Sequence, residues 1–303
     1  MAGEILTTLP EHYQTQFAQN WEFLAQQGDS RFKDKVRVES VNGKERQFSQ
    51  IGSVGPMRLI TTRNGATIPA DSPLAKRWVR PAGYDFVTWI DEWDDIALGE
   101  LPAPESAHVR AHAMAANRNV DDVIIEAATG TAYIGETGTT AVDLTSAEQV
   151  AVDYVESGSA ANSGMTIAKL RKAKYLLDAA EVEDDGRYVA VSAKQLQDLL
   201  ATTEVTSSDF NSVRALVRGE LNTFLGFTFV RSQRLDLVVS TDVRSCIAWH
   251  RDGILLGVGQ GRKARMDILP TQNHTIQIRT TEVIGATRME EARVVEIFCD
   301  ESP

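Results

Sequence analysis

The sequence contains only two cysteines, Cys246 and Cys299, among its 303 residues. Two widely spaced cysteines supply neither a disulfide framework nor a cysteine zinc cluster, and such scarcity is typical of a reducing compartment. No stretch approaches the ~20 apolar residues that a membrane span requires. The first residues also lack the basic and apolar segments of a secretory signal. We therefore expect a protein that neither spans a membrane nor is secreted by that route.

Basic residues are also in short supply. Lysine and arginine total 31 against 42 aspartates and glutamates, which gives a net charge of −11. Such a surface repels phosphate backbones, so a dedicated nucleic-acid binder is excluded and any contact with DNA is expected to be non-specific. Hydrophobic residues make up 43% and charged residues 24%, as in an ordinary folded protein. The length fits one large domain or two interleaved domains.

The N-terminal region predicts an amphipathic helical arm. Tyr13, Phe17, Trp21 and Leu24 recur at helical spacing within residues 10–27, and a basic connector follows. A stripe that ends in a charged connector has little core of its own to join. We expect Phe17 and Trp21 to dock on a neighbouring subunit.

Residues 41 to about 101 lose the helical period and alternate as strands do, with a hairpin signal at Asn64-Gly65. This segment of about 60 residues far exceeds the usual connection of about 4 to 6 residues. A two-stranded ribbon is only marginally stable alone in water. We expect its apolar face to be covered by another copy of the chain, with Lys76, Arg77 and Arg80 facing carboxylates there.

The rest of the chain mixes helices and strands. Residues 104–130 predict a long alanine-rich helix that ends at Gly130, and further helices are expected over 165–182, 193–201 and 209–221. The residues from Gly257 to Lys263 indicate a glycine-rich connector. The last two strands indicate a closing hairpin around Glu290 and Glu291.

No motif specifies an active site. His108 and His112 have metal-binding spacing on a helix, but the second position of an H-E-x-x-H motif is Val109. The glycines from Gly257 fit neither the Rossmann fingerprint nor the P-loop, because Arg262 stands where both require glycine. An acidic cluster near residue 93 lacks the spacing of an EF-hand and indicates a solvated turn. We expect no catalytic residues, no cofactor and no bound metal.

Several stretches resemble one branch of the major capsid proteins of tailed bacteriophages, which have the Hong Kong 97-type fold. These stretches are QNWEFLAQQGDSRF, NRNVDDVIIEAATGTAYIG, RYVAVSAKQLQDLLATTEVTSSDFNSVRALVRGELNTFLGFTFVRSQRL and IGATRMEEARVVEIFCDE. The resemblance implies an α+β fold in five parts. They are an N-terminal arm (1–40), an extended E-loop ribbon (41–103), a P-domain with a spine helix (104–182), an A-domain (183–261) and closing P-domain strands (262–303).

The resemblance further implies a structural subunit, not an enzyme, that assembles as pentamers and hexamers into an icosahedral shell around double-stranded DNA. Its implied location is the virion capsid, with assembly in the host cytoplasm. The implied partners are a separate scaffolding protein and a portal protein, and a decoration or cement protein stays open. The residues expected at the assembly interface are Phe17, Trp21, Lys76, Arg77, Trp78 and Arg80.

Two alternatives remain at this point. An encapsulin-type nanocompartment shell shares the same fold but encloses enzymes instead of a genome. A metal- or nucleotide-dependent soluble enzyme would use His108, His112 or the glycines at 257–263.

Overall fold

The computed structural model describes residues 26–63, 65–66, 69, 71–90, 105–201, 223–272 and 274–302. The predicted arm helix, with Phe17 and Trp21, lies almost wholly outside these residues. The hairpin residue Asn64, the acidic cluster near residue 93 and the predicted helix over 209–221 also lie outside them.

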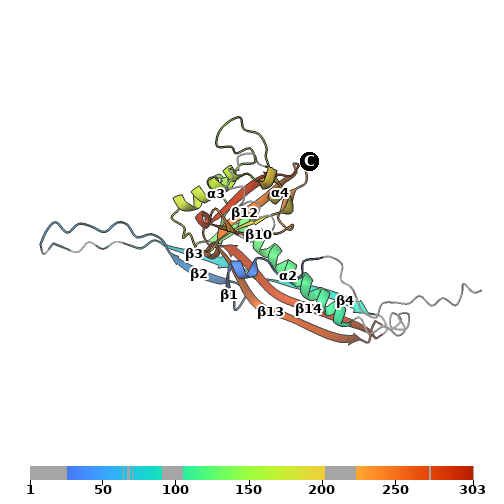
Figure 1. Ribbon diagram of the computed structural model, residues 1–303. Coiled ribbons are helices and arrows are strands. Elements are labelled where there is room, and N and C mark those ends of the chain that lie inside the picture. Colours follow the sequence, from blue (N-terminus) through green and yellow to red (C-terminus); the bar gives the residue numbers. More distant parts are fainter. Residues whose placement is uncertain are drawn as a thin grey trace, which may run out of the picture.

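Three sheets organise the described part of the chain (Figure 1). The long sheet has the strand order β1 (Arg37–Ser40), β13 (Ile254–Leu269), β14 (Thr275–Arg288) and β4 (Ala82–Ile90). The ribbon sheet has the order β2 (Arg46–Ile51), β3 (Leu74–Val79), β5 (Ala132–Ile134) and β6 (Thr140–Val142). The seven-stranded sheet has the order β7 (Gln149–Val150), β15 (Val294–Asp300), β12 (Val243–His250), β8 (Arg187–Val191), β10 (Phe227–Arg231) and β9 (Thr223–Phe224), with β11 (Leu237–Val238) beside β12.

The predicted spine helix is present as α2 (Glu105–Thr129), which lies along the long sheet (Figure 1). At 1.5 Å per residue it is about 37 Å long. Val120, Ile124 and Ala128 recur every four residues and are buried, so one helix face joins the core. The helices that the structure describes all lack the combination of length and apolar character needed to cross a bilayer.

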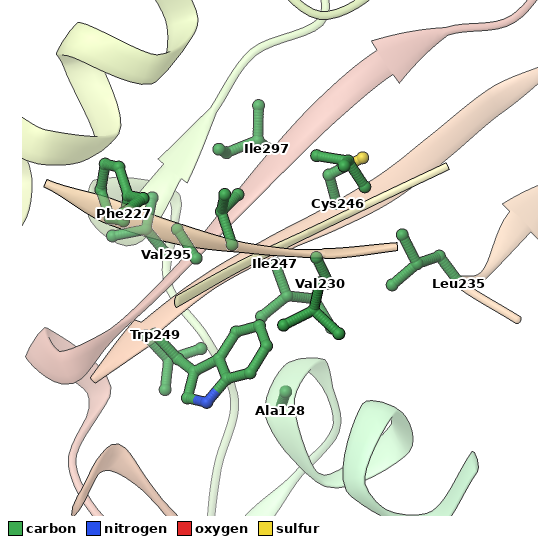
Figure 2. Close-up of a cluster of buried hydrophobic side chains, with 14 of the residues drawn as sticks. Ala128, Phe227, Val230, Leu235, Cys246, Ile247, Trp249, Val295 and Ile297 are labelled. Carbon is green, nitrogen blue, oxygen red and sulfur yellow. The ribbon is translucent and has the colours of Figure 1, made fainter. Parts of the chain in front are cut away.

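The main core surrounds the seven-stranded sheet, which is covered by α3 (Ile167–Ala179) and α4 (Ala193–Ala201). Trp249 lies at its base near Ala128 of the spine helix (Figure 2). Its indole is stacked on Phe32 at 5.5 Å and tilted against Tyr188 at 5.6 Å. The indole N–H donates to the carbonyl of Lys35 at 3.0 Å. One side chain therefore joins the segment after the arm, the spine and the seven-stranded sheet.

The predicted hairpin around Glu290 and Glu291 is wrong. The strand before this turn, β14, pairs with β13 and β4, whereas the strand after it, β15, pairs with β12 and β7. The two strands are adjacent in sequence but differ in their surroundings. The first four residues of β15 are all buried, which suits a strand covered on both faces, whereas β14 alternates between buried and less buried residues and exposes Arg279.

The predicted connector from Gly257 to Lys263 is also wrong, because these residues form the middle of β13. Its pairing with β14 shifts register between Val258 and Gln260 and again between Gln260 and Lys263. Such bulges let glycine-containing strands continue instead of ending. β13 therefore crosses the predicted boundary between residues 261 and 262. The ribbon is also shorter than expected, because β4 belongs to the long sheet.

Candidate assembly interface

The ribbon starts from a small apolar core of its own. Phe48 of β2 and Val79 of β3 are buried there with Val41, Leu255 and Met289. This cluster fixes the root of the ribbon to the long sheet. Beyond it, the chain between β2 and β3 runs outward as a long projection (Figure 1).

Two glycines allow the ribbon root to cross closely over the long sheet. Gly257 and Gly285 face each other in the β13–β14 pair. A Cβ on Gly257 would lie 2.7 Å from the side chains of Val41 and Val79. A Cβ on Gly285 would lie 2.7 Å from the carbonyl oxygen of Arg80. Neither position has room for a larger residue, so the crossing depends on both glycines.

The structure brings the predicted interface residues Lys76, Arg77, Trp78 and Arg80 together at this root, on and just after β3. The three cations pair with carboxylates of the same chain: Lys76 with Glu136 at 2.6 Å, Arg77 with Glu291 at 2.5 Å and Arg80 with Glu45 at 3.1 Å. The sequence predicts that these cations face carboxylates of an adjacent subunit, whereas the structure supplies a partner within the chain. Sequence reasoning missed this because Glu136 and Glu291 are distant from β3 along the chain.

Trp78 and Arg80 both bind the turn between β5 and β6. The indole N–H of Trp78 donates to the carbonyl of Gly135 at 2.8 Å. A Cβ on Gly138 would lie 2.7 Å from the Trp78 ring, so the ring lies directly against this glycine. Arg80 donates to the carbonyl of Gly138 at 2.7 Å and stacks over the Tyr133 ring at 4.6 Å. A role of these residues in assembly stays a prediction.

A buried cluster of charged side chains lies at the ribbon root and consists of Arg77, Glu291 and Arg288. Arg288 is fully buried, and its Nε lies 3.6 Å from the Glu291 carboxylate. Burial lowers the pKa of Arg288, with nearby Arg77 lowering it further against the opposing effect of Glu291. Burial alone would raise the pKa of Glu291, but the hydrogen bond and charge of Arg77 outweigh it and the pKa is lowered. The carboxylate is therefore held ionised between two guanidiniums.

The ribbon also exposes apolar side chains beyond its root. They are Ile51, Val54, Met57, Leu59, Ile60 and Leu74, all at least half exposed. Met57 is about 102% exposed and Ile60 89%, so these side chains gain nothing from the fold of their own subunit. An exposed apolar patch of this kind is typical of an interaction surface.

Asp121 on α2 anchors the segment that follows the arm, and sequence reasoning missed it. Its buried carboxylate accepts hydrogen bonds from the Ser30 hydroxyl at 2.5 Å and the Arg31 backbone N–H at 3.0 Å. The Gln27 amide donates to the same carboxylate at 2.5 Å. An aspartate within a helix gives no sequence signal for this role, because its partners lie about 90 residues earlier.

Within the predicted histidine pair, His112 has both ring nitrogens in contact with hydroxyl groups of the same chain. His112 is buried beneath α2, with Nε2 at 2.8 Å from the Thr88 hydroxyl and Nδ1 at 3.2 Å from the Thr280 hydroxyl. Burial lowers its pKa, and His108 lowers it further. Nowhere in the described ranges do three or more metal-ligating side chains of His, Cys, Asp or Glu gather. His112 instead ties the spine helix to β4 and β14.

Comparisons with known proteins agree with this architecture. The sequence profile of a family described as phage capsid protein matches residues 9–301. Among curated proteins, no sequence matches this chain.

Solved phage capsids have similar structures at low sequence identity. The capsid of cyanophage Pam1 is 16% identical with a TM-score of 0.71, covering 99% of each chain. The capsid of Ralstonia phage GP4 is 9% identical with a TM-score of 0.72, covering 100% of each chain. The head of Helicobacter pylori bacteriophage KHP40 is 10% identical with a TM-score of 0.71, again covering 100% of each. At such identities the likeness establishes the fold alone.

The family match spans nearly the whole sequence and favours neither the nanocompartment nor the enzyme alternative. The chain belongs to the phage capsid protein family and is a structural subunit of a phage capsid.

Proposed function

We propose that copies of this chain assemble as pentamers and hexamers into an icosahedral shell that encloses double-stranded DNA. The observation that carries the proposal is the ribbon, whose described apolar side chains are at least half exposed in their own subunit; they are Ile51, Val54, Met57, Leu59, Ile60 and Leu74. Burial of apolar surface contributes about 25 cal/mol per Å². Repeated at every contact of a closed shell, this contribution favours assembly over the free subunit.

The predicted residues at the ribbon root contribute to assembly in this proposal by holding the ribbon at a fixed angle. These residues are Lys76, Arg77, Trp78 and Arg80, and they act through contacts within the subunit. The contact with the neighbour is made by the apolar tip of the ribbon, which consists of Met57, Leu59 and Ile60. Exposed ion pairs contribute only about 0 to 1 kcal/mol each. The apolar contact therefore supplies most of the free energy of association, and the charges set the geometry.

The proposed partners are a separate scaffolding protein and a portal protein, with a decoration or cement protein left open, and the proposed place of assembly is the host cytoplasm. The net charge of −11 supports only non-specific contact with the packaged DNA, because a tightly bound lining would impede movement of the genome.

Electron microscopy of the purified chain, expressed with and without its scaffolding protein, tests the proposal. We expect closed shells of uniform size in the co-expressed sample. A strictly monomeric or dimeric chain under every assembly condition, scaffold included, would contradict it.

A further inference from the structure

A cavity of about 150 Å³ lies between the middle of α2 and the long sheet, where the helix lies along β4 and β14 (Figure 1). Two neighbouring cross-strand pairs form its floor, Tyr84 with Glu282 and Phe86 with Thr280. The residues of α2 that form its roof are His112, Ala115, Ala116 and Asn119. The alanine side chains are too short to fill the space between helix and sheet, and a void is left.

Aromatic rings form one wall of this cavity. Phe86 meets His112 edge to face, with the two ring centroids 4.6 Å apart. Burial lowers the pKa of His112, so the imidazole is neutral at pH 7 and does not repel a cation. Phe86 is 51% exposed, and the wall that it forms therefore reaches the surface. The faces of neutral aromatic rings attract cations.

Glu282 supplies a buried carboxylate to the same cavity. Its side chain accepts a hydrogen bond from the Asn119 amide at 3.1 Å and the residue is only 6% exposed. Its ion pair with Arg262 is 3.7 Å long, which exceeds hydrogen-bond distance. The Arg262 guanidinium donates instead to the side-chain oxygen of Asn117 at 2.8 Å. The carboxylate of Glu282 can therefore accept hydrogen bonds from a further donor.

The electrostatic field around Tyr84 also favours a cation. Burial raises the pKa of the Tyr84 hydroxyl, and the charges of Glu126 and Glu282 raise it further. Both carboxylates therefore act on the part of the cavity that this ring lines. The net charge of the whole chain, −11, has the same sign. An anionic ligand would be repelled here.

We propose that this cavity binds a small organic ammonium ion, with its alkyl chain against Phe86 and Ala116 and its ammonium group donating to Glu282. A cavity of about this size holds a ligand as large as benzene, or about six non-hydrogen atoms. A primary ammonium group on a chain of about four carbons fits within that limit. Aromatic rings together with a carboxylate are groups that recognise organic cations. The inference goes beyond the proposed function, because it concerns a ligand of the single subunit.

Titration of the isolated full-length subunit with n-butylammonium chloride tests the inference. Butan-1-ol is the neutral ligand of equal size, and sodium chloride controls for ionic strength. Calorimetry and ligand-observed NMR measure binding. We expect saturable binding of the amine and at least about tenfold weaker binding of the alcohol, because only the amine forms a charged contact. Equal affinities would overturn the preference for ammonium, and the absence of saturable binding up to about 50 mM would overturn the site.

Glu282→Gln removes the charge but keeps an acceptor for Asn119. Glu296→Gln is the matched control, because Glu296 is 7% exposed and accepts hydrogen bonds from Ser245 and Gln149 in the seven-stranded sheet. We expect n-butylammonium to bind at least about tenfold more weakly to Glu282→Gln, and to bind Glu296→Gln as it binds the wild type. Unchanged binding to Glu282→Gln, or an equal loss in both variants, would overturn the role of Glu282.

Ala116→Leu tests the location, since the larger side chain would occupy the cavity. Ala113→Leu is the control on the same helix, because Ala113 is outside the cavity lining that the structure describes. We expect Ala116→Leu to lose binding of both the amine and the alcohol, and Ala113→Leu to keep it. Retained binding in folded Ala116→Leu would overturn the location. If Ala116→Leu fails to fold, the Glu282→Gln and Glu296→Gln pair decides.

An ammonium group can come from two sources, a free amine or a lysine side chain of another polypeptide. Nα-acetyllysinamide carries the same butylammonium group on a peptide unit and is titrated in parallel. Binding of both compounds supports a lysine side chain as ligand, and binding of n-butylammonium alone supports a free amine. None of these measurements requires particles. A failure here therefore leaves the proposed function intact, and a failure of assembly leaves the site intact.

Discussion

The guanidinium of Arg288 closes the end of the spine helix by donating to the carbonyl of Ala128 at 2.9 Å. It also donates to the carbonyl of Gly130 at 2.8 Å and to that of Val142 at 3.1 Å. The last carbonyls of a helix lack partners within the helix and need others. A strand residue far along the chain thus completes α2 and connects it to the ribbon root through Glu291.

Arg288→Met should destabilise the isolated subunit by about 3 kcal/mol or more, because it leaves buried carbonyls without donors at about 1–3 kcal/mol each. Chemical denaturation measures the loss. Arg279→Met is the matched control on the same strand, since Arg279 is half exposed and its ion pair is with Asp85. We expect the control to change stability by less than about 1 kcal/mol. Similar effects of the two variants would contradict the capping role.

Phe32→Ala should cost about 3–5 kcal/mol, the usual range for removing a buried phenylalanine. Phe32 is 1% exposed and stacks on Trp249. Loss of the ring should also quench the distinct near-ultraviolet circular dichroism of the buried indole. Phe32→Leu, which keeps most of the volume, should lose much less. An unchanged unfolding midpoint in Phe32→Ala would show that this anchor carries little stability.

Glu301 should make the subunit sensitive to acid. Burial alone would raise its pKa, but hydrogen bonds from Arg244, Ser192 and Gln195 outweigh it and hold the pKa below the usual 4.5. A depressed pKa in the folded state contributes stability above pH 4.5 that is lost as the pH falls through the folded value.

Glu301→Gln should therefore be less stable at pH 7, by about 1–3 kcal/mol, because Arg244 stays buried without its anion. Its stability should also fall less steeply than that of the wild type below pH 4.5. Denaturation midpoints between pH 3 and 7 measure both effects. Glu156→Gln, at an exposed pair with Arg171, is the control and should follow the wild type. Parallel curves for the wild type and Glu301→Gln would refute the assignment.

The triple variant Met57→Ser, Leu59→Ser, Ile60→Ser should leave the isolated subunit as stable as the wild type, because these side chains are 87% exposed or more. Particle yield should nevertheless fall by at least about tenfold, since the apolar contact with a neighbour is lost. Unfolding curves and sedimentation of co-expressed particles measure the two quantities. Normal particle yield would show that the tip is not buried on assembly.

A charge swap separates contacts within the subunit from contacts between subunits. Lys76→Glu places two carboxylates together at Glu136 and should lower particle yield. Adding Glu136→Lys restores an opposite pair in the same place, so we expect the double variant to assemble as the wild type does. Failure of the double variant, with its subunit folded, would mean that Lys76 acts on a neighbouring subunit.

Local patterns were sufficient to predict α2. The alanine-rich period and the terminal Gly130 define its bounds to within a residue. The predicted hairpin at Glu290 is wrong because the pairing of strands depends on long-range contacts. Local signals do not record that β14 and β15 separate into different sheets.

The contacts of the predicted interface residues could not be predicted for a similar reason. The sequence predicts that Lys76, Arg77, Trp78 and Arg80 face a neighbouring subunit, which stays a prediction, whereas the structure shows their cations paired within the chain. Their partners Glu45, Glu136 and Glu291 come from three different segments, and no spacing in the sequence relates these segments. The roles of Arg288 and Asp121 were missed because the sequence alone does not show whether a charged side chain is buried or exposed.

Because the ribbon is long, a small rotation at its root produces a large displacement at its far end. About 11 extended residues between Ile51 and the tip span about 35 Å at about 3.3 Å each. A rotation of about 5° at the root would therefore displace the tip by about 3 Å, enough to move a methyl group out of its pocket. The contacts that hold the root come from the two facing glycines, the indole of Trp78 and the buried carboxylate of Glu291. A stiff root would let every subunit reach the same point on its neighbour. All shells would then have the same curvature.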